Sequence, residues 1–419
     1  MSNTRRLLHL LLVATFIALL VSVGPAPTEA GRNAIAQGRG SQVPRFQVDP
    51  FWPKPLPNHW VLGSVTGVAV DRRDHIWIVH RGADSMANNE KGAVLNPPTG
   101  CCVPAPQVLE FDQSGNLVSY WGGPGQGFDW PQSPGGITVD HKGNVWIAAA
   151  GPPQASTRSQ SGGGTAGGGS AGASVTSTAP KPADAHVIKF SSTGKFLMQI
   201  GHAGKSGTAD SKTELNRPAA IRSDPAANEV YVADGFGNRR VVVFDADSGA
   251  YKRHWGAYGD KPNDAELGPY DPAAAAAKQF RDMTCAALAK DGSVYVCDRR
   301  NNRIQVFKKD GTFIKEAFVS RTTLGDGAVW DLAFSHDPQQ RFIYVADGHD
   351  KRVLMLRRDT LEVVSSFGSG GRMAGQFYGV GSIAVDSKGN IYTGETYEGK
   401  RVQKFIFKGM GDAEAARNP

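Results

Sequence analysis

"VYVCDRRNNRIQVF", residues 294–307, holds two short apolar stretches on either side of a polar turn. The chain just before it, "CAALAKDGS" at residues 285–293, adds another apolar stretch and a turn that contains glycine. Apolar runs this short, separated by such turns, are typical of antiparallel β-strands. The segment therefore predicts three consecutive strands, the second of which carries the aromatic residue Tyr295.

Five further segments repeat this arrangement, with Trp or Tyr in the second strand. They are "GVAVDRRDHIWIVHRG" (67–82), "GITVDHKGNVWIAAAG" (136–151), "AIRSDPAANEVYVADG" (220–235), "DLAFSHDPQQRFIYVADG" (331–348) and "SIAVDSKGNIYTGE" (382–395). A third strand follows in each of the six units, and a fourth can be read in five of them. Four short strands in a fixed order are typical of a β-propeller blade, because each small sheet buries its faces against its neighbours. The sequence thus predicts an all-β, six-bladed β-propeller with four-stranded blades.

The sixth unit lacks a convincing fourth strand, since it runs out at "FIFKGMGDAEAARNP" (405–419). Near the N-terminus, "PRFQVDP" (44–50) alternates Phe46 and Val48 in the manner of a strand. Because an unclosed ring would expose a sheet edge, we expect residues 45–48 to complete the last blade and close the ring.

The N-terminus resembles an export signal. Arg5 and Arg6 precede an apolar run that small residues follow, as in secretory signal peptides. We therefore assign residues 1–36 to a signal peptide and short leader, 37–410 to the propeller and 411–419 to a C-terminal tail. The predicted location is secreted or periplasmic. The alternative is that the signal segment stays uncleaved and anchors the chain. We expect contact with a membrane only in that case.

One segment interrupts the repeats. Residues 151–184 are rich in Gly and Ser and contain almost no apolar side chain that could be buried. This composition predicts a disordered insertion between the second and third strands of blade two.

The formal net charge of +7 is not concentrated in a basic run with interleaved aromatics. Such runs are typical of nucleic-acid-binding chains, so we expect no nucleic-acid partner.

If the chain is exported, its four cysteines can form disulfides, because an oxidising compartment permits them. Cys285 and Cys297 flank "AALAKDGSVYV" and would face each other across a hairpin if residues 290–292 turn the chain. The adjacent Cys101 and Cys102 would then be left to each other, as a vicinal disulfide or as free thiols. No CxxC or CxxCH pattern is present, so zinc clusters and covalent haem lack their usual signal.

Acidic and basic residues recur at fixed positions between the second and third strands. Asp298 has counterparts at Asp234, Asp347 and Glu395, and Arg303 has counterparts at Arg240, Arg352 and Arg401. We expect each acid to pair with the arginine of its own hairpin. Arg299 is different, because only Arg81 in blade one offers another arginine near that position. Both could reach the mouth of the central channel and bind an anion there, or they could form surface or inter-blade ion pairs.

These units resemble NHL repeats, and the elements "IVHRG", "VADGFGN" and "DRRNNRIQVF" resemble the propeller of peptidyl-alpha-hydroxyglycine alpha-amidating lyase and its bacterial secreted relatives. The resemblance implies a central zinc held by three histidines, assisted by a tyrosine and by arginines that correspond to Arg81 and Arg299. The zinc positions correspond to Gly135, Thr284 and Gly381, the tyrosine to Phe236, and an acidic calcium ligand to Ser382. Zinc and calcium are therefore expected from the family, but their ligands are absent and we predict no cofactor.

Two classes of function follow from these observations. The first is a non-catalytic propeller that binds a peptide, glycan or small anion at the channel face, with Arg81, Arg299, His80 and Phe236 as candidate ligand-binding residues. The second is a carbon–nitrogen lyase of the peptidylamidoglycolate type whose metal site is displaced or absent. Loss of the metal ligands together with the tyrosine favours binding.

Overall fold

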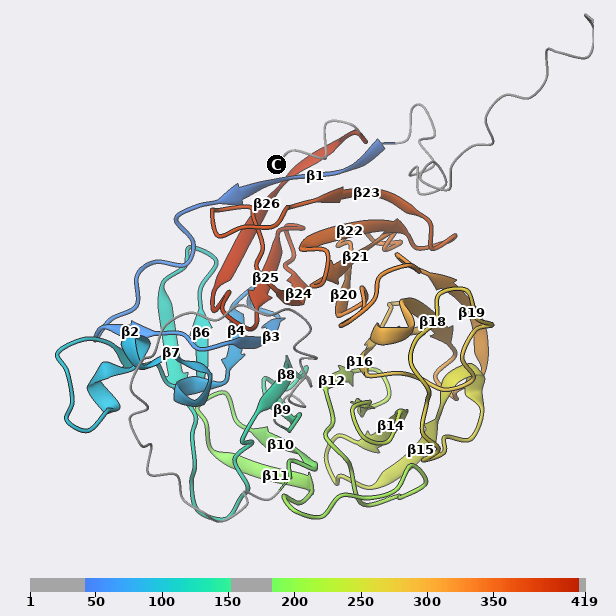
Figure 1. Cartoon of the computed structure of the whole chain (residues 1–419), viewed down its shortest axis with the longest axis horizontal. Coiled ribbons are helices and arrows are strands. Elements are labelled where there is room, and N and C mark those ends of the chain that lie inside the picture. The colour runs from blue at the N-terminus through green and yellow to red at the C-terminus, as the bar shows by residue number, and fades with distance from the viewer. Residues whose placement is uncertain (1–41, 152–182, 414–419) are drawn as a thin grey trace, which may run out of the picture. The chain divides into compact units, whose positions relative to one another are not determined.

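A computed structural model of the chain describes residues 42–151 and 183–413, and these form six four-stranded antiparallel sheets around a central axis (Figure 1). The predicted six-bladed all-β propeller is therefore confirmed. The predicted signal peptide, most of the Gly/Ser-rich insertion and the end of the predicted tail lie outside the described residues. None of the described helices is long and apolar enough to cross a membrane.

Each of the first five blades consists of four strands consecutive in the chain, apart from the short β5 within blade one, and the innermost strand comes first. The strands are β3 (Val65–Val70), β4 (Ile76–His80), β6 (Val108–Phe111) and β7 (Leu117–Trp121) in blade one; β8 (Pro134–Val139), β9 (Val145–Ala149), β10 (His186–Phe190) and β11 (Phe196–Gly201) in blade two; β12 (Ala220–Asp224), β13 (Glu229–Asp234), β14 (Arg240–Asp245) and β15 (Tyr251–Trp255) in blade three; β16 (Met283–Leu288), β17 (Val294–Asp298), β18 (Arg303–Phe307) and β19 (Phe313–Phe318) in blade four; and β20 (Asp331–Phe334), β21 (Phe342–Asp347), β22 (Arg352–Arg357) and β23 (Val363–Phe367) in blade five.

Blade six closes the ring with the N-terminal strand, as predicted. It consists of β24 (Val380–Val385), β25 (Ile391–Glu395), β26 (Val402–Asp412) and, on its outer edge, β1 (Gln42–Asp49). β1 pairs antiparallel with β26, and the Phe46 ring lies 5.4 Å from the rings of both Tyr344 and Phe367 in blade five. The closing strand therefore also covers the apolar face of the neighbouring blade. β26 continues past residue 410 to Asp412.

The six aromatic residues that mark the second strands are buried in the core: Trp77, Trp146, Tyr231, Tyr295, Tyr344 and Tyr392. Both indole rings among them donate a hydrogen bond to an aspartate in the preceding turn, from Trp77 to Asp71 and from Trp146 to Asp140. The recurring turn aspartate therefore satisfies the polar atom of an otherwise apolar side chain.

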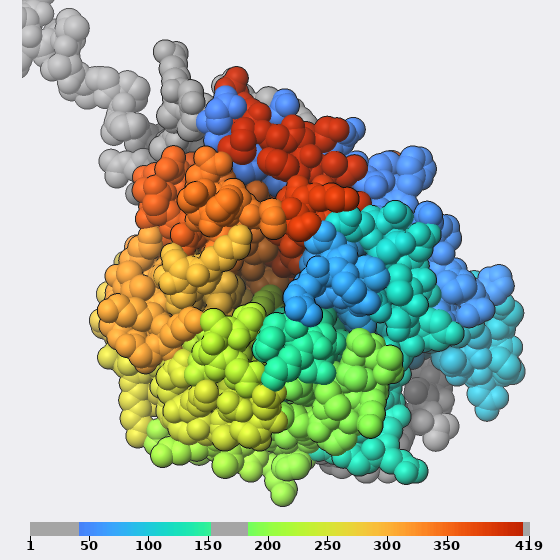
Figure 2. Space-filling model, turned by 180° about the vertical axis from the view of Figure 1, so that it is seen from behind, coloured from blue at the N-terminus to red at the C-terminus, as the bar shows by residue number. Residues whose placement is uncertain are grey.

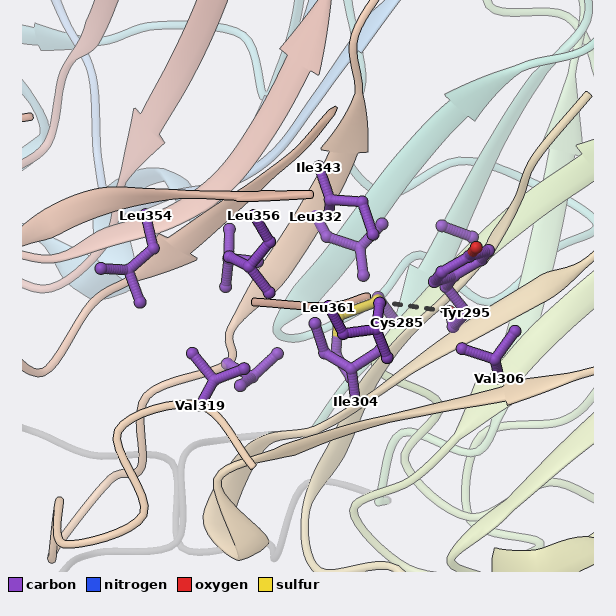
Figure 3. Packing of buried hydrophobic residues seen from close by; sticks show 14 of the residues in the cluster. Cys285, Tyr295, Ile304, Val306, Val319, Leu332, Ile343, Leu354, Leu356 and Leu361 are labelled. Carbon is purple, nitrogen blue, oxygen red and sulfur yellow. Dashed lines mark hydrogen bonds between the residues drawn. A yellow bond between two sulfur atoms is a disulfide. The ribbon is translucent and has the colours of Figure 1, made fainter. Parts of the chain in front are cut away.

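The blades are held together by the apolar faces of adjacent sheets. Between blades four and five, Figure 3 shows Ile304, Leu332 and Ile343 gathered around the Cys285 disulfide. Cys285 and Cys297 are directly opposite each other in the β16–β17 register and are bonded, with Cα atoms 4.9 Å apart. Both cysteines are fully buried, and the predicted pairing is confirmed.

The predicted pairing of acid and arginine within each hairpin is also confirmed. Arg303 Nε lies 2.7 Å from Asp298 Oδ2, and Arg240 Nε lies 2.9 Å from Asp234 Oδ2, with no exposure of any of these side chains. The equivalent pairs are Asp347 with Arg352 and Glu395 with Arg401. The pairs join the end of the second strand to the start of the third and belong to the architecture of the blades.

Candidate anion site at the channel mouth

Six residues, each within one position of the start of an innermost strand, surround one cavity of about 90 Å³ on the propeller axis: Thr66, Gly135, Ala219, Thr284, Trp330 and Gly381. Arg81, Arg299 and Phe236 line the same cavity. Three of the four candidate ligand-binding residues are therefore brought together, although they come from blades one, three and four.

The fourth candidate, His80, is placed differently, and the expectation that it faces a ligand needs correction. Its ring is fully buried; Nδ1 accepts hydrogen bonds from the backbone N–H groups of Gly63 and Gly82, while Nε2 donates to the carbonyl of Pro106. Burial lowers the pKa of His80 to about 4. Both nitrogens are occupied by the backbone, so His80 is a neutral anchor beside Arg81.

Arg299 lies in the turn η6 (Arg299–Asn301), directly after β17. Its guanidinium carbon is 4.7 Å from the ring centroid of Trp330 and 5.7 Å from that of Phe236. Its Nη2 lies 3.7 Å from Oδ2 of Asp282, which is its acidic partner. Nε is buried and has no hydrogen-bond partner among the described residues. Burial lowers the pKa of Arg299, and Asp282 opposes this shift only in part.

Arg81 follows the last residue of β4 and lines the same cavity as Arg299. Its Nε is buried without a hydrogen-bond partner among the described residues. Burial lowers the pKa of Arg81, Tyr397 and Asp184 oppose the shift, and the charge of Arg299 adds to it. The positive charge of Arg299 therefore disfavours the charged form of Arg81.

A third arginine, Arg217, was missed by the sequence analysis. It donates from Nη2 to the carbonyl of Phe236 at 2.9 Å and lies over that ring at 5.8 Å, and its buried Nε has no hydrogen-bond partner in the part of the chain that the structure describes. Burial lowers its pKa as well. Arg217 stands two residues before Ala219, in the connection into blade three rather than in the repeat, so the comparison of repeats could not find it.

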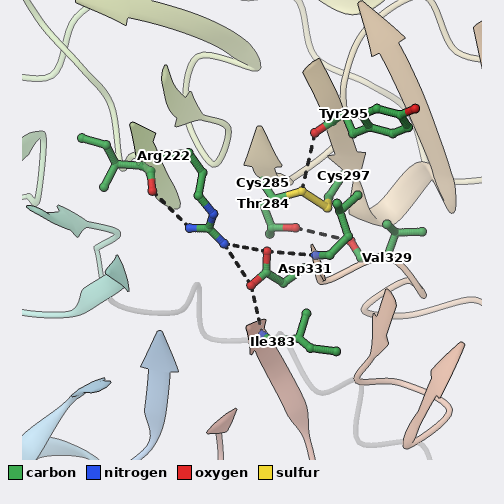
Figure 4. Close-up of a disulfide and its surroundings, with 10 residues drawn as sticks. Arg222, Thr284, Cys285, Tyr295, Cys297, Val329, Asp331 and Ile383 are labelled. Carbon is green, nitrogen blue, oxygen red and sulfur yellow. Dashed lines mark hydrogen bonds and ion pairs between the residues drawn. A yellow bond between two sulfur atoms is a disulfide. The ribbon is translucent and has the colours of Figure 1, made fainter. Parts of the chain in front are cut away.

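An ion pair between Arg222 and Asp331 crosses the channel and forms part of the cavity wall. Arg222 Nη2 lies 2.9 Å and 3.1 Å from the two carboxylate oxygens of Asp331, which also accepts the backbone N–H of Ile383 at 3.2 Å (Figure 4). Blades three, five and six are thus joined at the axis. Arg222 also lines a hollow of about 330 Å³ further along the channel. Figure 2 views the molecule from the side opposite to Figure 1 and shows a hollow near its centre.

The comparisons with known proteins agree with this architecture. The family model of the NHL repeat matches residues 280–307, which contain the first three strands of blade four in full. The chain is a six-bladed propeller that carries an NHL repeat in blade four.

The propeller is homologous to two kinds of curated protein. NHL repeat-containing protein 3 of Mus musculus is 24% identical over 378 residues, which cover 87% of this chain and 84% of that protein. Peptidyl-glycine alpha-amidating monooxygenase A of Xenopus laevis is 25% identical over 261 residues, or 61% of this chain and 22% of that protein. Among solved structures, "Streptogramin B lyase structure" aligns with 87% of this chain and 98% of its own, with a TM-score of 0.47 and 11% identity.

The channel of this NHL-repeat propeller does not fit the zinc centre that the amidating lyases imply. A Cβ atom on Gly135 would lie 2.5 Å from the carbonyl oxygen of Ala219, so no histidine can occupy that position in this backbone. Thr284 donates its hydroxyl to the carbonyl of Val329, and Gly381 has no side chain. The three positions therefore offer no imidazole and, at one of them, no room for any side chain.

Other metal ligands in the described residues do not replace that centre. Asp71, His75 and Glu110 lie close together, but Arg73 forms ion pairs with both acids. At the calcium position, Ser382 supplies one neutral hydroxyl where a hard cation takes several charged or carbonyl oxygens.

Proposed function

We propose that this propeller binds small carboxylate anions at the channel mouth, between Arg81 and Arg299, and does not turn them over. The main support for this proposal is that both arginines line one cavity and both have a buried Nε without a hydrogen-bond partner among the described residues. Buried polar atoms are nearly always paired in native proteins. A bound anion would supply the missing acceptor and would relieve the repulsion between the two cations.

The size and walls of the cavity support a small, planar ligand. A cavity of about 90 Å³ is several times larger than the roughly 10–15 Å³ that one water molecule needs, so it accommodates a carboxylate of a few heavy atoms. The rings of Trp330 and Phe236 beside Arg299 add flat, apolar surface. A guanidinium fork matches the two oxygens of a carboxylate better than an ammonium does. A peptide or glycan would have to present such a group to the mouth and leave its body outside.

The test compares ligands that differ only in charge. Acetate should raise the unfolding temperature of the purified chain in a concentration-dependent manner, because a ligand that binds only the folded state stabilises it. Acetamide has almost the same shape without the negative charge and should have no effect at equal concentration. Glyoxylate and glucuronate extend the series in polarity and size. Equal shifts with acetate and acetamide would contradict the proposal.

A lyase activity of the peptidyl-hydroxyglycine amidating type is the second candidate, and the homology to the amidating enzymes is what favours it. It predicts that a peptidyl-hydroxyglycine is cleaved to an amide and glyoxylate, and that the activity follows the metal content. Elemental analysis of dialysed protein combined with a glyoxylate assay separates the two candidates. Stoichiometric bound zinc together with turnover would replace the binding proposal.

A further inference from the structure

The second disulfide lies in the connection between β4 and β6, which carries the short helices η2 (Gly82–Ser85), η3 (Asn88–Glu90) and η4 (Gly92–Val94) and the strand β5 (Val103–Pro104). Cys101 and Cys102 are bonded to each other, with Cα atoms 3.5 Å apart. Cys101 is exposed and Cys102 is half-buried. The sequence left open whether these two cysteines form a vicinal disulfide or remain free thiols, and the structure has the vicinal disulfide.

This bond contributes little to the stability of the fold. A disulfide stabilises mainly by restricting the unfolded chain, and the effect grows with the length of the loop that it closes. Cys101 and Cys102 are neighbours in sequence, so the loop is the shortest that exists. The separation of Cys285 and Cys297 is 12 residues. Stabilisation therefore does not explain the vicinal pair.

The vicinal ring instead fixes a local backbone conformation. Cys102 has a φ of 100°, in a region that residues with a side chain rarely adopt. Its carbonyl accepts the N–H of Ala93, and the carbonyl of Cys101 accepts the hydroxyl of Thr99. When the ring is opened, Cys102 can return to an ordinary backbone conformation, and these two contacts lose the geometry that supports them.

The same connection is tied to the channel mouth. The residue after the disulfide, Val103, donates its N–H to the carbonyl of His59, and Pro106 accepts a hydrogen bond from His80. His80 in turn holds the N–H of Gly82, and Arg81 lies between these two residues. A change at the disulfide can therefore reach the backbone on both sides of Arg81 through a short series of direct contacts.

We propose that Cys101–Cys102 is a reversible redox site that dithiol reductants attack while the propeller stays folded. A thiolate of the dithiol attacks the sulfur of the exposed residue Cys101, the Cys101–Cys102 bond breaks, and the electron pair leaves on Cys102, which takes up a proton. The second thiol of the reductant then displaces Cys101 from the mixed disulfide. The products are two protein thiols and one oxidised dithiol, with no other reactant. The inference does not depend on carboxylate binding.

Accessibility makes the reaction selective, because thiol–disulfide exchange requires direct approach to a sulfur atom. The buried pair Cys285–Cys297 is an internal control in the same chain. With dithiothreitol as the probe under native conditions, followed by alkylation and peptide mass analysis, Cys101 and Cys102 should become labelled at least about tenfold faster than the buried pair. Oxidised glutathione should restore the bond after the dithiothreitol is removed.

Three results would overturn this proposal. They are labelling of all four cysteines at one rate, labelling of Cys101 and Cys102 before any reductant is added, and failure of the bond to form again. A trivalent arsenical, phenylarsine oxide, provides a second readout, because it condenses with two adjacent thiols and releases water. One equivalent should add to the mildly reduced chain and none to the oxidised chain.

Hydrogen exchange tests the conformational consequence. Reduction should accelerate amide exchange in residues 82–105 and leave blade four unchanged, since the buried disulfide remains closed. The double variant Cys101→Ser/Cys102→Ser should show the fast exchange without reductant and no further response to it. If that variant does not fold, the parent chain in its two redox states still gives the answer. Equal exchange of residues 82–105 in both states would contradict the coupling to the loop.

Discussion

Arg303 and Arg299 are four residues apart in blade four, and both are largely withdrawn from water, but their surroundings differ completely. Arg303 donates from Nε to Asp298 at 2.7 Å, from Nη1 to the hydroxyl of Tyr258 at 2.7 Å and from Nη2 to the carbonyl of Gln279 at 3.3 Å. Its side chain has no exposure. Every edge of this guanidinium is satisfied by the protein itself.

Arg299 keeps 12% of its side chain exposed and has an acidic neighbour only at 3.7 Å. Its flat faces contact aromatic rings, while its buried Nε has no partner in the described chain. Burial alone therefore does not distinguish the two arginines. Their hydrogen bonds do, since the paired cation of Arg303 holds the fold, whereas Arg299 keeps a donor to which a ligand could bind.

The largest effect is expected where the satisfied arginine is removed. Arg303→Ala leaves Asp298 as a buried charge without its ion-pair partner, which should lower the free energy of unfolding by roughly 3–5 kcal/mol. Denaturant titration measures this loss. Arg357→Ala is the matched control, because Arg357 is an exposed arginine paired with the exposed Asp359, and it should change stability by no more than about 0.5 kcal/mol. If the two variants have the same stability, the architectural role of Arg303 is wrong.

The pair in blade five lies between these extremes, because Asp347 is fully buried while Arg352 is 35% exposed. Burial, with the nearby charge of Asp350, raises the pKa of Asp347 from 3.8 to about 7. Between these values the folded chain holds a proton that the unfolded chain has released. The free energy of unfolding should therefore fall as the pH rises through this window, by up to about 1.4 kcal/mol per pH unit.

Asp347→Asn should remove this contribution to the slope. The measurement is the difference between the free energies of unfolding of parent and variant from pH 4 to pH 8. Asp350→Asn is the informative control, since removal of the neighbouring negative charge should lower the pKa of Asp347 and move the fall in stability to lower pH. Parallel stability profiles of the parent and Asp347→Asn would contradict the raised pKa.

The smallest change in stability is expected at the unsatisfied arginine. Arg299→Met replaces a buried cation with an apolar side chain of similar length and leaves Asp282, which also pairs with Arg300 at 3.1 Å, with a partner. Burial of a charge whose hydrogen bonds are incomplete is costly, and Asp282 keeps Arg300 as its partner, so the free energy of unfolding should stay the same or rise by about 1 kcal/mol. A loss comparable to that of Arg303→Ala would place Arg299 with the architecture.

The sequence predicted the features that repeat within a blade. The register of the six units placed the strands and the acid–arginine pairs, and the alternation of Phe46 and Val48 located the closing strand. The repeat pattern of the sequence could not predict contacts between blades. The Arg222–Asp331 pair joins blades three and five, and Arg217 reaches Phe236 from a connection outside the repeat. Such contacts depend on which side chains converge at the axis.

His80 shows the same limit at a single residue. Its position beside Arg81 suggested a ligand-binding role, but its partners are backbone groups of Gly63, Gly82 and Pro106. Two of these lie well away from His80 in the sequence, in a turn and a connection that carry no recognisable pattern. The close approach of Gly135 to Ala219, which leaves no room for a side chain, is likewise visible only in three dimensions.

Calorimetric titration of the parent chain, Arg81→Ala and Arg299→Ala with one small carboxylate, with Arg357→Ala as the control, tests the central claim most directly. A charge-assisted hydrogen bond contributes roughly 1.5–3 kcal/mol. Each channel variant should therefore bind about ten- to a hundredfold more weakly, and raised salt should weaken binding to the parent. Arg357→Ala should bind like the parent. If the parent binds no carboxylate, or if it binds one that both channel variants bind equally well, the unsatisfied arginines do not form an anion site.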